Sequence, residues 1–196
     1  MYVPPEFVCD ELAAWSIVDS FPFALLVAPE LDAVHVPLVR RGSVIVGHVA
    51  RASSFASVIE SRAAALAVFS GPHAFVSPRT YVSPRQVPTW NYVSAHVHGR
   101  LEPIGDVEGA VEVLRMLSRA FDPDWDAEPM LSARAGGLAK GIVAFELRVE
   151  RIVGKQKLGQ NRADVDRIAA GEVLARSGRD DERAIGERML AIAPRT

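Results

Sequence analysis

The sequence has one cysteine and almost no net charge. Cys9 stands alone among 196 residues, so neither an internal disulfide nor a cysteine-based zinc site can form. This suits a reducing compartment, and we expect a cytoplasmic protein. The 22 basic and 24 acidic residues leave a formal charge of −2, which gives no general attraction to nucleic acid or to an anionic membrane.

Long apolar runs are also absent. No run reaches the ~18 residues that a membrane span needs, so we expect no membrane association. Residues 1–6 lack the basic and apolar regions of a signal peptide. Hydrophobic residues make up 49% of the chain and charged residues 23%, which suits one globular domain, with or without an appendage.

The first half of the chain changes from helical to strand periodicity. Asp10 is a candidate N-cap for a helix to about residue 19, with Leu12, Trp15 and Val18 on its apolar face. Three apolar or alternating segments follow, at residues 23–28, 34–38 and 43–49. The turns between them are short, which predicts antiparallel pairing, because parallel strands need long crossovers.

The rest of the chain adds further strands and a few helices. We predict helices at residues 54–60, from 106 to the break at 122–124, and at 130–138, strands at 64–69, 92–104 and 142–153, and two tail helices separated by Ser177-Gly178. Gly99 suggests a bulge in its strand. The predicted fold class is mostly β with peripheral helices, as a small antiparallel barrel.

Residues 69–99 form the most unusual segment. Prolines at 72, 78, 84 and 88 are expected to keep it from forming one long strand or helix. It also concentrates aromatic rings, an amide and imidazoles. A connection of this kind is typical of a functional loop, and composition supports a stiff structural loop equally well.

Several motifs in this order resemble the PaiB family, the FMN-binding negative transcriptional regulators. The matching segments are Met1-Tyr2-Val3-Pro4, His35-Val36-Pro37-Leu38, Gly47-His48-Val49-Ala50-Arg51-Ala52, Gly71-Pro72-His73-Ala74, Val76-Ser77-Pro78, Val87-Pro88-Thr89-Trp90-Asn91-Tyr92, Lys157-Leu158 and Gln160-Asn161-Arg162. The resemblance spans residues 1 to about 175. It implies an FMN-binding split barrel that works as a homodimer, with flavin at the subunit interface.

The sequence departs from the family at three motif positions. Ser53 stands where Asn is common, Phe75 where Tyr is frequent and Gly159 where Ser is usual. The last change puts in doubt a hydroxyl contact at that point of the site.

Arg51 and Ser53 are the predicted phosphate ligands. They lie where a strand gives way to a helix, so a guanidinium, a hydroxyl and free backbone N–H groups come together. From the residues taken by themselves, an N-cap at Ser53 and a solvated Arg51 are the better explanation of the pattern. The resemblance favours the phosphate of FMN.

Trp90, Asn91, Lys157, Gln160 and Asn161 are the predicted residues around the flavin ring and ribityl chain. An indole can wall off a planar cofactor, and amides can pair with the pyrimidine edge of the ring. Lys157 or Arg162 can hold phosphate or stabilise the reduced ring. Structural alternatives are a core Trp90 and a helix cap at Asn161.

The five histidines suggest a competing haem or metal protein. His96 and His98 share one strand face, because side chains alternate, and two imidazoles at this spacing can ligate a metal. A third ligand would have to come from His73, His48 or a carboxylate, and no familiar metal-site spacing fits. We predict no metal site.

The functional prediction is an FMN-binding regulator of PaiB type, with a flavin-dependent reductase as the enzymatic alternative. The sequence identifies no catalytic residue. We predict a flavin-binding domain at residues 1–161 and a helical appendage at 162–196. The appendage carries seven basic and seven acidic residues, so DNA binding is doubtful.

Overall fold

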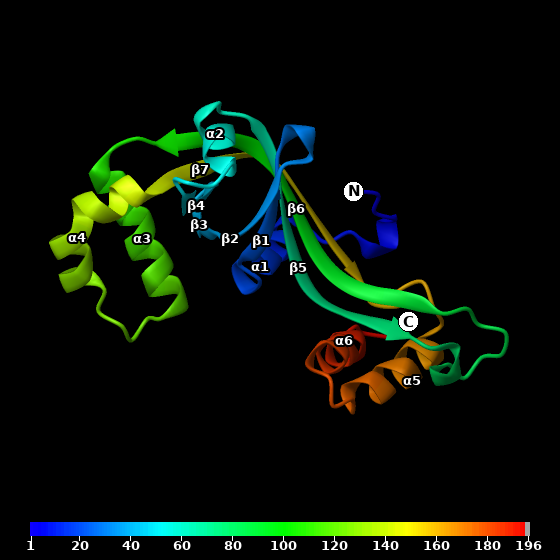
Figure 1. Cartoon of the computed structure of the whole chain (residues 1–196). Coiled ribbons are helices and arrows are strands. Elements are labelled where there is room, and N and C mark those ends of the chain that lie inside the picture. The colour runs from blue at the N-terminus through cyan, green and yellow to red at the C-terminus, as the bar shows by residue number, and fades with distance from the viewer. Residues whose placement is uncertain (195–196) are drawn as a thin grey trace. The chain divides into compact units, whose positions relative to one another are not determined.

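Seven strands form one sheet in a computed structural model that describes residues 1–194 (Figure 1). Their order across the sheet is β2-β1-β5-β6-β7-β4-β3. The strands are β1 Phe23–Val27, β2 Ala33–Pro37, β3 Val39–Arg41, β4 Val44–Ala50, β5 Ala64–Val76, β6 Thr89–Ile104 and β7 Ile142–Lys157. The pairs β1–β2 and β3–β4, which short turns connect, are antiparallel as predicted. The pairs β1–β5 and β4–β7, which are distant in the chain, are antiparallel as well.

Within residues 1–194, six α-helices and three short 3₁₀ helices accompany the strands. The α-helices are α1 Glu11–Ser20, α2 Phe55–Glu60, α3 Val107–Phe121, α4 Glu128–Gly141, α5 Asp164–Ala175 and α6 Asp180–Leu190, and the 3₁₀ helices are η1 Pro5–Phe7, η2 Pro29–Leu31 and η3 Pro78–Thr80. The cap predicted at Asp10 and the helix start predicted at residue 106 are both confirmed. Asp10 accepts a 2.8 Å hydrogen bond from the N–H of Ala13, and Asp106 accepts one of 2.7 Å from Gly109.

The chain divides into two compact units. Unit 1 contains Met1–Ile17, Ser70–Ala95 and the chain from Val153 onward, and unit 2 contains Val18–Phe69 and His96–Ile152. Strands β5, β6 and β7 each continue from one unit into the other. The division at residue 161 into a flavin domain and an appendage stays a prediction.

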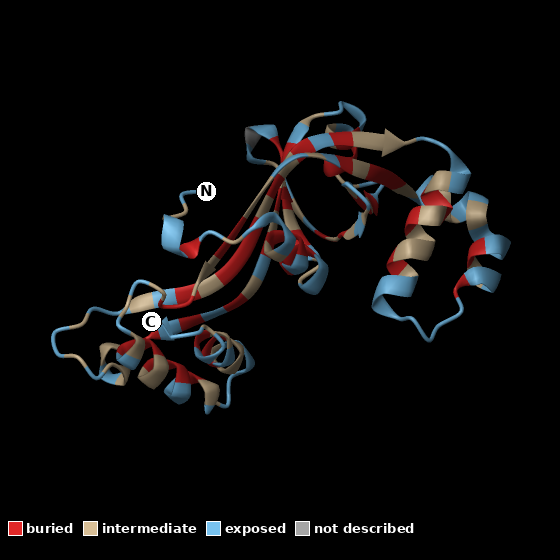
Figure 2. Ribbon diagram, turned by 180° about the vertical axis from the view of Figure 1, so that it is seen from behind, coloured by how far each residue is buried: buried red, intermediate tan, exposed pale blue. Residues whose placement is uncertain are grey.

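The core of unit 2 lies where α3 packs on β4 and β7. Val113 and Leu117 of α3 are buried with Val46 of β4 and Ala144 of β7. A second cluster joins α3 to α4 through Val111, Ala127 and Leu131. Figure 2 shows buried residues along the strands and on one side of α3. The apolar face of α3, which the sequence predicts, therefore packs against this core.

In unit 1, the tail helices α5 and α6 pack closely against each other. A Cβ on Gly186 of α6 would lie 2.7 Å from the carbonyl oxygen of Gly171 in α5 and would also meet the backbone of Ala175. Leu174, Ile185 and Met189 are buried at this contact. The two tail helices predicted from sequence are confirmed.

Two local predictions were wrong. Pro72 lies inside β5, which runs on to Val76. Strand β1 pairs only with Leu66–Val68 of β5, so the missing N–H of Pro72 removes no hydrogen bond to β1. Leu12 is 81% exposed, whereas Trp15 and Val18 are buried as predicted, together with Ala14 and Ile17.

Gly99 lies within β6, and the bulge expected there stays a prediction. A Cβ there would collide with the backbone of Arg148 in β7, so the glycine permits a close approach of two backbones. Finally, no helix within residues 1–194 has the length and apolar character to cross a membrane.

Candidate functional site

Arg51 follows β4 in unit 2, and its guanidinium is bonded to the end of α4. Its Nε donates to the carbonyl of Lys140 at 3.0 Å, and its Nη2 donates to the carbonyl of Ile142 at 2.7 Å. Its Nη1 lies 3.4 Å from a carboxylate oxygen of Glu60. The last carbonyls of a helix have no partner within the helix, so Arg51 caps α4 and complements its dipole.

Ser53 makes a local turn before α2. Its hydroxyl accepts a 3.2 Å hydrogen bond from the N–H of Phe55, while Ser54 occupies the N-cap position without a side-chain bond. The hydroxyl hydrogen of Ser53 is still available to a ligand. The helix that follows has only six residues, so its dipole adds little to an anion site here.

A hollow of about 320 Å³ lies beside Arg51 in unit 2. Its floor is apolar, from Ile104, Ala110 and Ile142, and Lys140 and Asp106 contribute charges of opposite sign. Because Glu60 also neutralises Arg51, the surroundings of this guanidinium are close to neutral.

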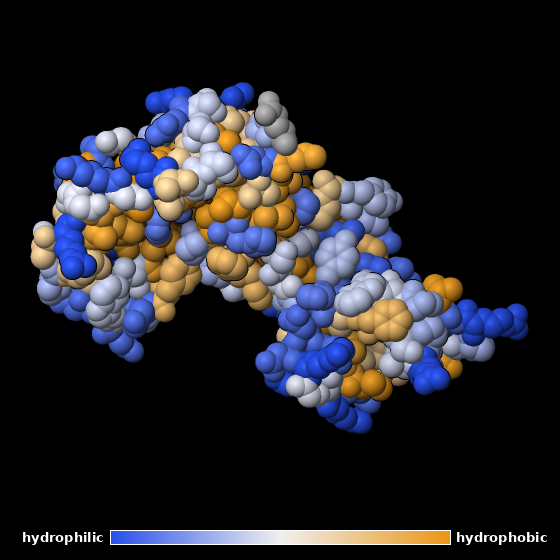
Figure 3. Space-filling model, viewed as in Figure 1, coloured by the Kyte–Doolittle hydropathy of each residue, from blue (hydrophilic) through white to orange (hydrophobic). Residues whose placement is uncertain are grey.

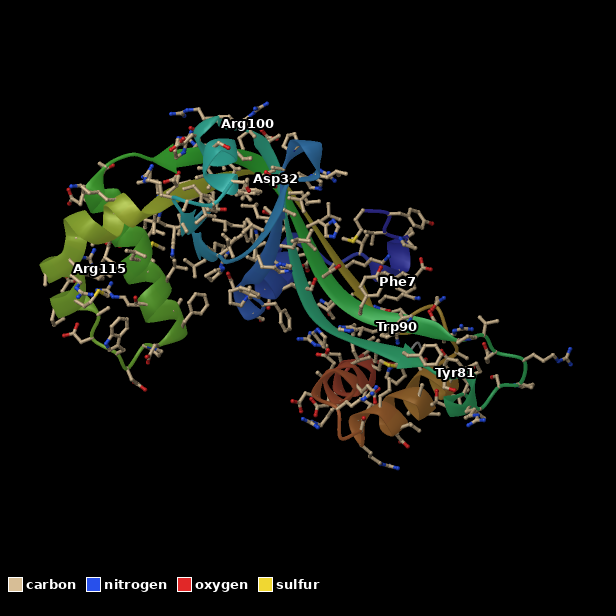
Figure 4. The ribbon with its side chains drawn as sticks, viewed as in Figure 1. Phe7, Asp32, Tyr81, Trp90, Arg100 and Arg115 are labelled. Carbon is tan, nitrogen blue, oxygen red and sulfur yellow. The ribbon has the colours of Figure 1, made fainter. Side chains whose placement is uncertain are left out.

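Trp90 is part of a partly exposed aromatic cluster in unit 1. Its side chain is 53% exposed, and its ring centroid lies 5.7 Å from that of His73 and 6.0 Å from that of Phe75. His73 and Phe75 are two residues apart on β5 and therefore share one face. Figure 4 labels Trp90 on β6, and Tyr81 in the loop after β5. Such an exposed flat surface suits stacking with a planar ligand.

Asn91 points to the opposite face of β6 from Trp90, since neighbouring side chains in a strand alternate. It is buried, and its Nδ2 lies 3.3 Å from the sulfur of Met189 in α6. Its Oδ1 is buried without a hydrogen-bond partner in the described structure. An acceptor left in this state costs about 1–3 kcal/mol. Trp90 and Asn91 are therefore not brought together on one surface.

Lys155, Lys157 and Arg162 form a basic cluster in unit 1. Lys155 is only 8% exposed; its Nζ donates to the carbonyl of Tyr2 at 3.1 Å and lies 5.1 Å from the centre of the Tyr92 ring. Lys157 donates to the hydroxyl of Thr89. Burial, followed by the charges of Lys155 and Arg162, lowers the pKa of Lys157.

Gln160 closes the turn after β7. Its Oε1 accepts from the N–H of Leu158 at 2.7 Å, and its Nε2 donates to the carbonyl of Gln156 at 2.7 Å. Asn161 is exposed, and Ala163 takes the N-cap position of α5, so the cap alternative for Asn161 is not what the structure shows. Gly159 has φ +84°, a left-handed conformation that glycine adopts without strain and that a residue with a side chain adopts at a cost.

The loop between β5 and β6 is held by a residue that sequence reasoning missed. Asp166 of α5 is buried and accepts hydrogen bonds from the N–H groups of Val82 and Ser83 at 2.9 and 2.8 Å. These bonds, the one from Ser83 first, lower the pKa of Asp166. Gln86 links the same carboxylate to Arg162, whose guanidinium lies 5.1 Å from the Tyr81 ring centre. A local pattern contains no signal for a partner 83 residues away.

The histidines do not assemble into a metal site in the part of the chain that is described. No group of three His, Cys, Asp or Glu side chains within residues 1–194 is placed to hold a metal ion. Nδ1 of His48 and Nε2 of His98 are buried without hydrogen-bond partners there. Burial lowers the pKa of His48, His96 and His98.

Residues 1–151 match the family described as "Putative FMN-binding domain". The chain belongs to this FMN-binding family. It is also 30% identical over 201 aligned residues, covering 96% of both chains, to the protease synthase and sporulation protein PAI 2 of Bacillus subtilis (strain 168). The prediction of an FMN-binding protein of PaiB type is therefore confirmed.

Solved structures show the same fold at lower identity. The FAD and heme binding protein from Mycobacterium smegmatis has a TM-score of 0.62 at 19% identity, covering 76% of this chain and 72% of that one. The flavocytochrome Anf3 from Azotobacter vinelandii has a TM-score of 0.60 at 18% identity, covering 76% and 68%. The predicted split-barrel fold class is confirmed.

The residues of unit 1 fit FMN in their chemistry. Trp90 offers an exposed ring for stacking, and the basic cluster offers charge-assisted donors to an anion. Family membership thus agrees with the donor set, and it favours flavin over the haem or metal alternative. Flavin, when bound, supplies one- and two-electron chemistry; the protein supplies binding, orientation and electrostatics.

Proposed function

We propose that this chain is a homodimeric, cytoplasmic FMN-binding regulator that acts without reading DNA itself. Trp90 would stack on the flavin ring, and Lys157, Gln160 and Asn161 would contact its polar edge. Asn91 belongs to the same proposed set by the family resemblance; it lies on the opposite face of β6 from Trp90, and its buried Oδ1 has no hydrogen-bond partner within residues 1–194. Arg51 and Ser53 are the phosphate candidates proposed from the sequence.

The exposed aromatic cluster carries the proposal. An indole that is 53% exposed beside two other rings has no role in the core of unit 1. Cationic side chains lie in the same unit, so a ligand that combines a flat ring with an anionic group matches its chemistry. FMN is such a ligand, and the family of this chain binds it.

Absorption spectroscopy of the purified protein and titration of the apoprotein with FMN test the proposal. We expect flavin bands between about 350 and 500 nm and quenching of flavin fluorescence on binding. A protein that neither carries flavin nor quenches added FMN would contradict the proposal, and a haem band in place of flavin bands would favour the alternative.

The tail supports a regulatory role that does not depend on direct DNA contact. Arg167 pairs with Asp164 at 2.9 Å, Arg179 with Glu182 at 3.2 Å, and Arg183 with Asp180. A DNA reader instead offers unpaired cations to several phosphates, and its affinity falls steeply with salt. The single cysteine suits a reducing cytoplasm.

An anisotropy titration against the DNA upstream of the protein's own gene tests this point. We expect no specific binding at nanomolar concentration. Tight binding with a steep salt slope would refute the indirect role, and truncation after Asn161 would then show whether the tail is the reader.

The dimer is proposed from exposed hydrophobic side chains. Phe23, Phe75 and Trp90 are each about half or more exposed, more large apolar surface than solvent exposure favours. Light scattering at micromolar concentration with FMN present should give the mass of two chains. A monomeric mass would refute the assembly without affecting flavin binding.

A further inference from the structure

The two candidate anion sites differ in how their charge is balanced. Arg51 lies against Glu60 and donates to two carbonyls, so a carboxylate and a helix end already compensate its charge. Lys155 and Lys157 form no ion pair with a carboxylate in the described structure. Their partners are a carbonyl, a hydroxyl and an aromatic ring, all neutral.

Burial makes this imbalance costly. Lys155 is more than nine-tenths buried, and a buried charge normally has a partner of opposite sign because desolvation is expensive. Each ammonium has three N–H donors, and the hydrogen bonds described here use one on each. Burial and the neighbouring positive charges lower the pKa of Lys157, as expected where like charges are gathered.

The carboxylate of Asp166 is engaged elsewhere. Its oxygens accept from the amides of Val82 and Ser83 and from Gln86, and its charge acts on Arg162. Asp164 pairs with Arg167. Within residues 1–194 no carboxylate forms an ion pair with Lys155 or Lys157, so their positive charge is not balanced there.

We infer that this cluster is a phosphate-monoester site, with Lys157 and the Thr89 hydroxyl as direct ligands and Lys155 supplying charge beneath them. The inference rests on the proposed FMN binding. It moves the phosphate from Arg51 and Ser53 to unit 1, and it assigns Lys157 to the phosphate in place of the ring edge. A phosphate dianion bound at Lys157 compensates the positive charges of Lys155 and Lys157, which no carboxylate of the described residues balances. Arg51 then has a structural role at the end of α4.

The test compares FMN with riboflavin, which lacks the phosphate. Dissociation constants of both are measured by fluorescence quenching for the wild type and for Lys157→Gln, Lys157→Arg and Arg51→Gln. A charge-assisted contact predicts that the wild type binds FMN roughly tenfold or more tightly than riboflavin. Lys157→Gln should lose most of that preference while its riboflavin affinity stays within about twofold. Lys157→Arg should keep the preference, and Arg51→Gln should leave it unchanged.

Inorganic phosphate provides a second readout. It should compete with FMN in the wild type and lose this effect in Lys157→Gln, without competing with riboflavin. If Arg51→Gln removes the preference and Lys157→Gln does not, the inference is overturned and the original phosphate assignment holds. Equal wild-type affinities for FMN and riboflavin would overturn the inference but leave flavin binding intact. Failure to bind either flavin would refute the proposed function itself.

Discussion

The carboxylate of Asp166 in α5 accepts a 2.8 Å hydrogen bond from the backbone N–H of Ser83, which lies 83 residues earlier in the chain. The N–H of Val82 donates to the same oxygen at 2.9 Å. Loop amides that would otherwise be unpaired near a buried surface thus share one ionised acceptor. The tail consequently fixes the loop that leads into Trp90.

Asp166→Asn should destabilise the protein by about 1.5–3 kcal/mol at pH 7, because the amide is a weaker acceptor than the carboxylate. Urea unfolding measures the change. Asp180→Asn is the matched control: Asp180 is exposed and pairs on the surface with Arg183, so it should change stability by less than about 0.5 kcal/mol. Equal effects of the two substitutions would contradict the role given to Asp166.

The hydrogen bonds that Asp166 accepts also predict how the stability of the protein changes with pH. The folded-state pKa of Asp166 is lowered from its unfolded value of about 4, so its contribution to stability is present above pH 4 and is lost as pH falls through the folded-state pKa. The stability difference between the wild type and Asp166→Asn should therefore be constant between pH 5 and 7 and shrink below pH 4. A difference that grows on acidification would exclude this explanation.

Gly186→Ala should destabilise the α5–α6 pair by about 1–3 kcal/mol, because the new methyl group would meet the backbone of Gly171 and Ala175. Thermal unfolding followed by circular dichroism measures the effect. Gly178→Ala, between the same helices, has open space around its Cβ and should leave the melting temperature almost unchanged. A loss of stability in Gly186→Ala but not in Gly178→Ala would show that the close packing of the helices, rather than the removal of a glycine, causes the effect.

Arg51→Met should weaken unit 2 whether or not flavin is present. The carbonyls of Lys140 and Ile142 lose charged donors, at an expected cost of about 1.5–3 kcal/mol. Arg100→Met is a suitable control, since its 3.6 Å pair with Glu150 is well exposed. If Arg51→Met is as stable as the control, Arg51 does not cap α4.

Trp90→Phe should remove much of the quenching of protein fluorescence that FMN causes, because a stacked flavin quenches the indole beside it most strongly. Trp125 in unit 2 is 47% exposed, similar to Trp90, and Trp125→Phe provides the comparison. Titration of each variant with FMN at fixed protein concentration measures the quenching. If Trp125→Phe loses more of the quenching than Trp90→Phe does, the flavin ring would instead lie near Trp125 in unit 2.

Local chemistry was predictable from the sequence, and long-range contacts were not. The N-cap at Asp10, the start of a helix at Asp106 and the short turns between early strands depend on neighbours within a few residues, and they were predicted. The prediction for Pro72 was wrong because a strand tolerates proline only where no neighbouring strand needs its N–H, and β1 does not pair with β5 at Pro72. No sequence pattern shows where a neighbouring strand stops pairing.

The candidate site shows the same division. Its residue types were recognisable from the family resemblance, including Trp90 and Lys157. The carbonyls that hold Arg51 are 89 and 91 residues away, and the carbonyl that accepts from Lys155 belongs to Tyr2, 153 residues earlier in the chain. Charge balance at a site is set by tertiary neighbours, so only the structure could distinguish a compensated guanidinium from uncompensated lysines.

The division of each unit among separate chain segments also sets an order of events during synthesis. Unit 2 is complete once residue 152 has been translated, whereas unit 1 needs the chain from Val153 onward. At about 5–20 residues per second, residues 153–194 take roughly 2–8 s to appear. During that interval the face of β6 that carries Asn91 has no α6 to cover it. We therefore expect nascent chains that stop before α5 to be the aggregation-prone species on the ribosome.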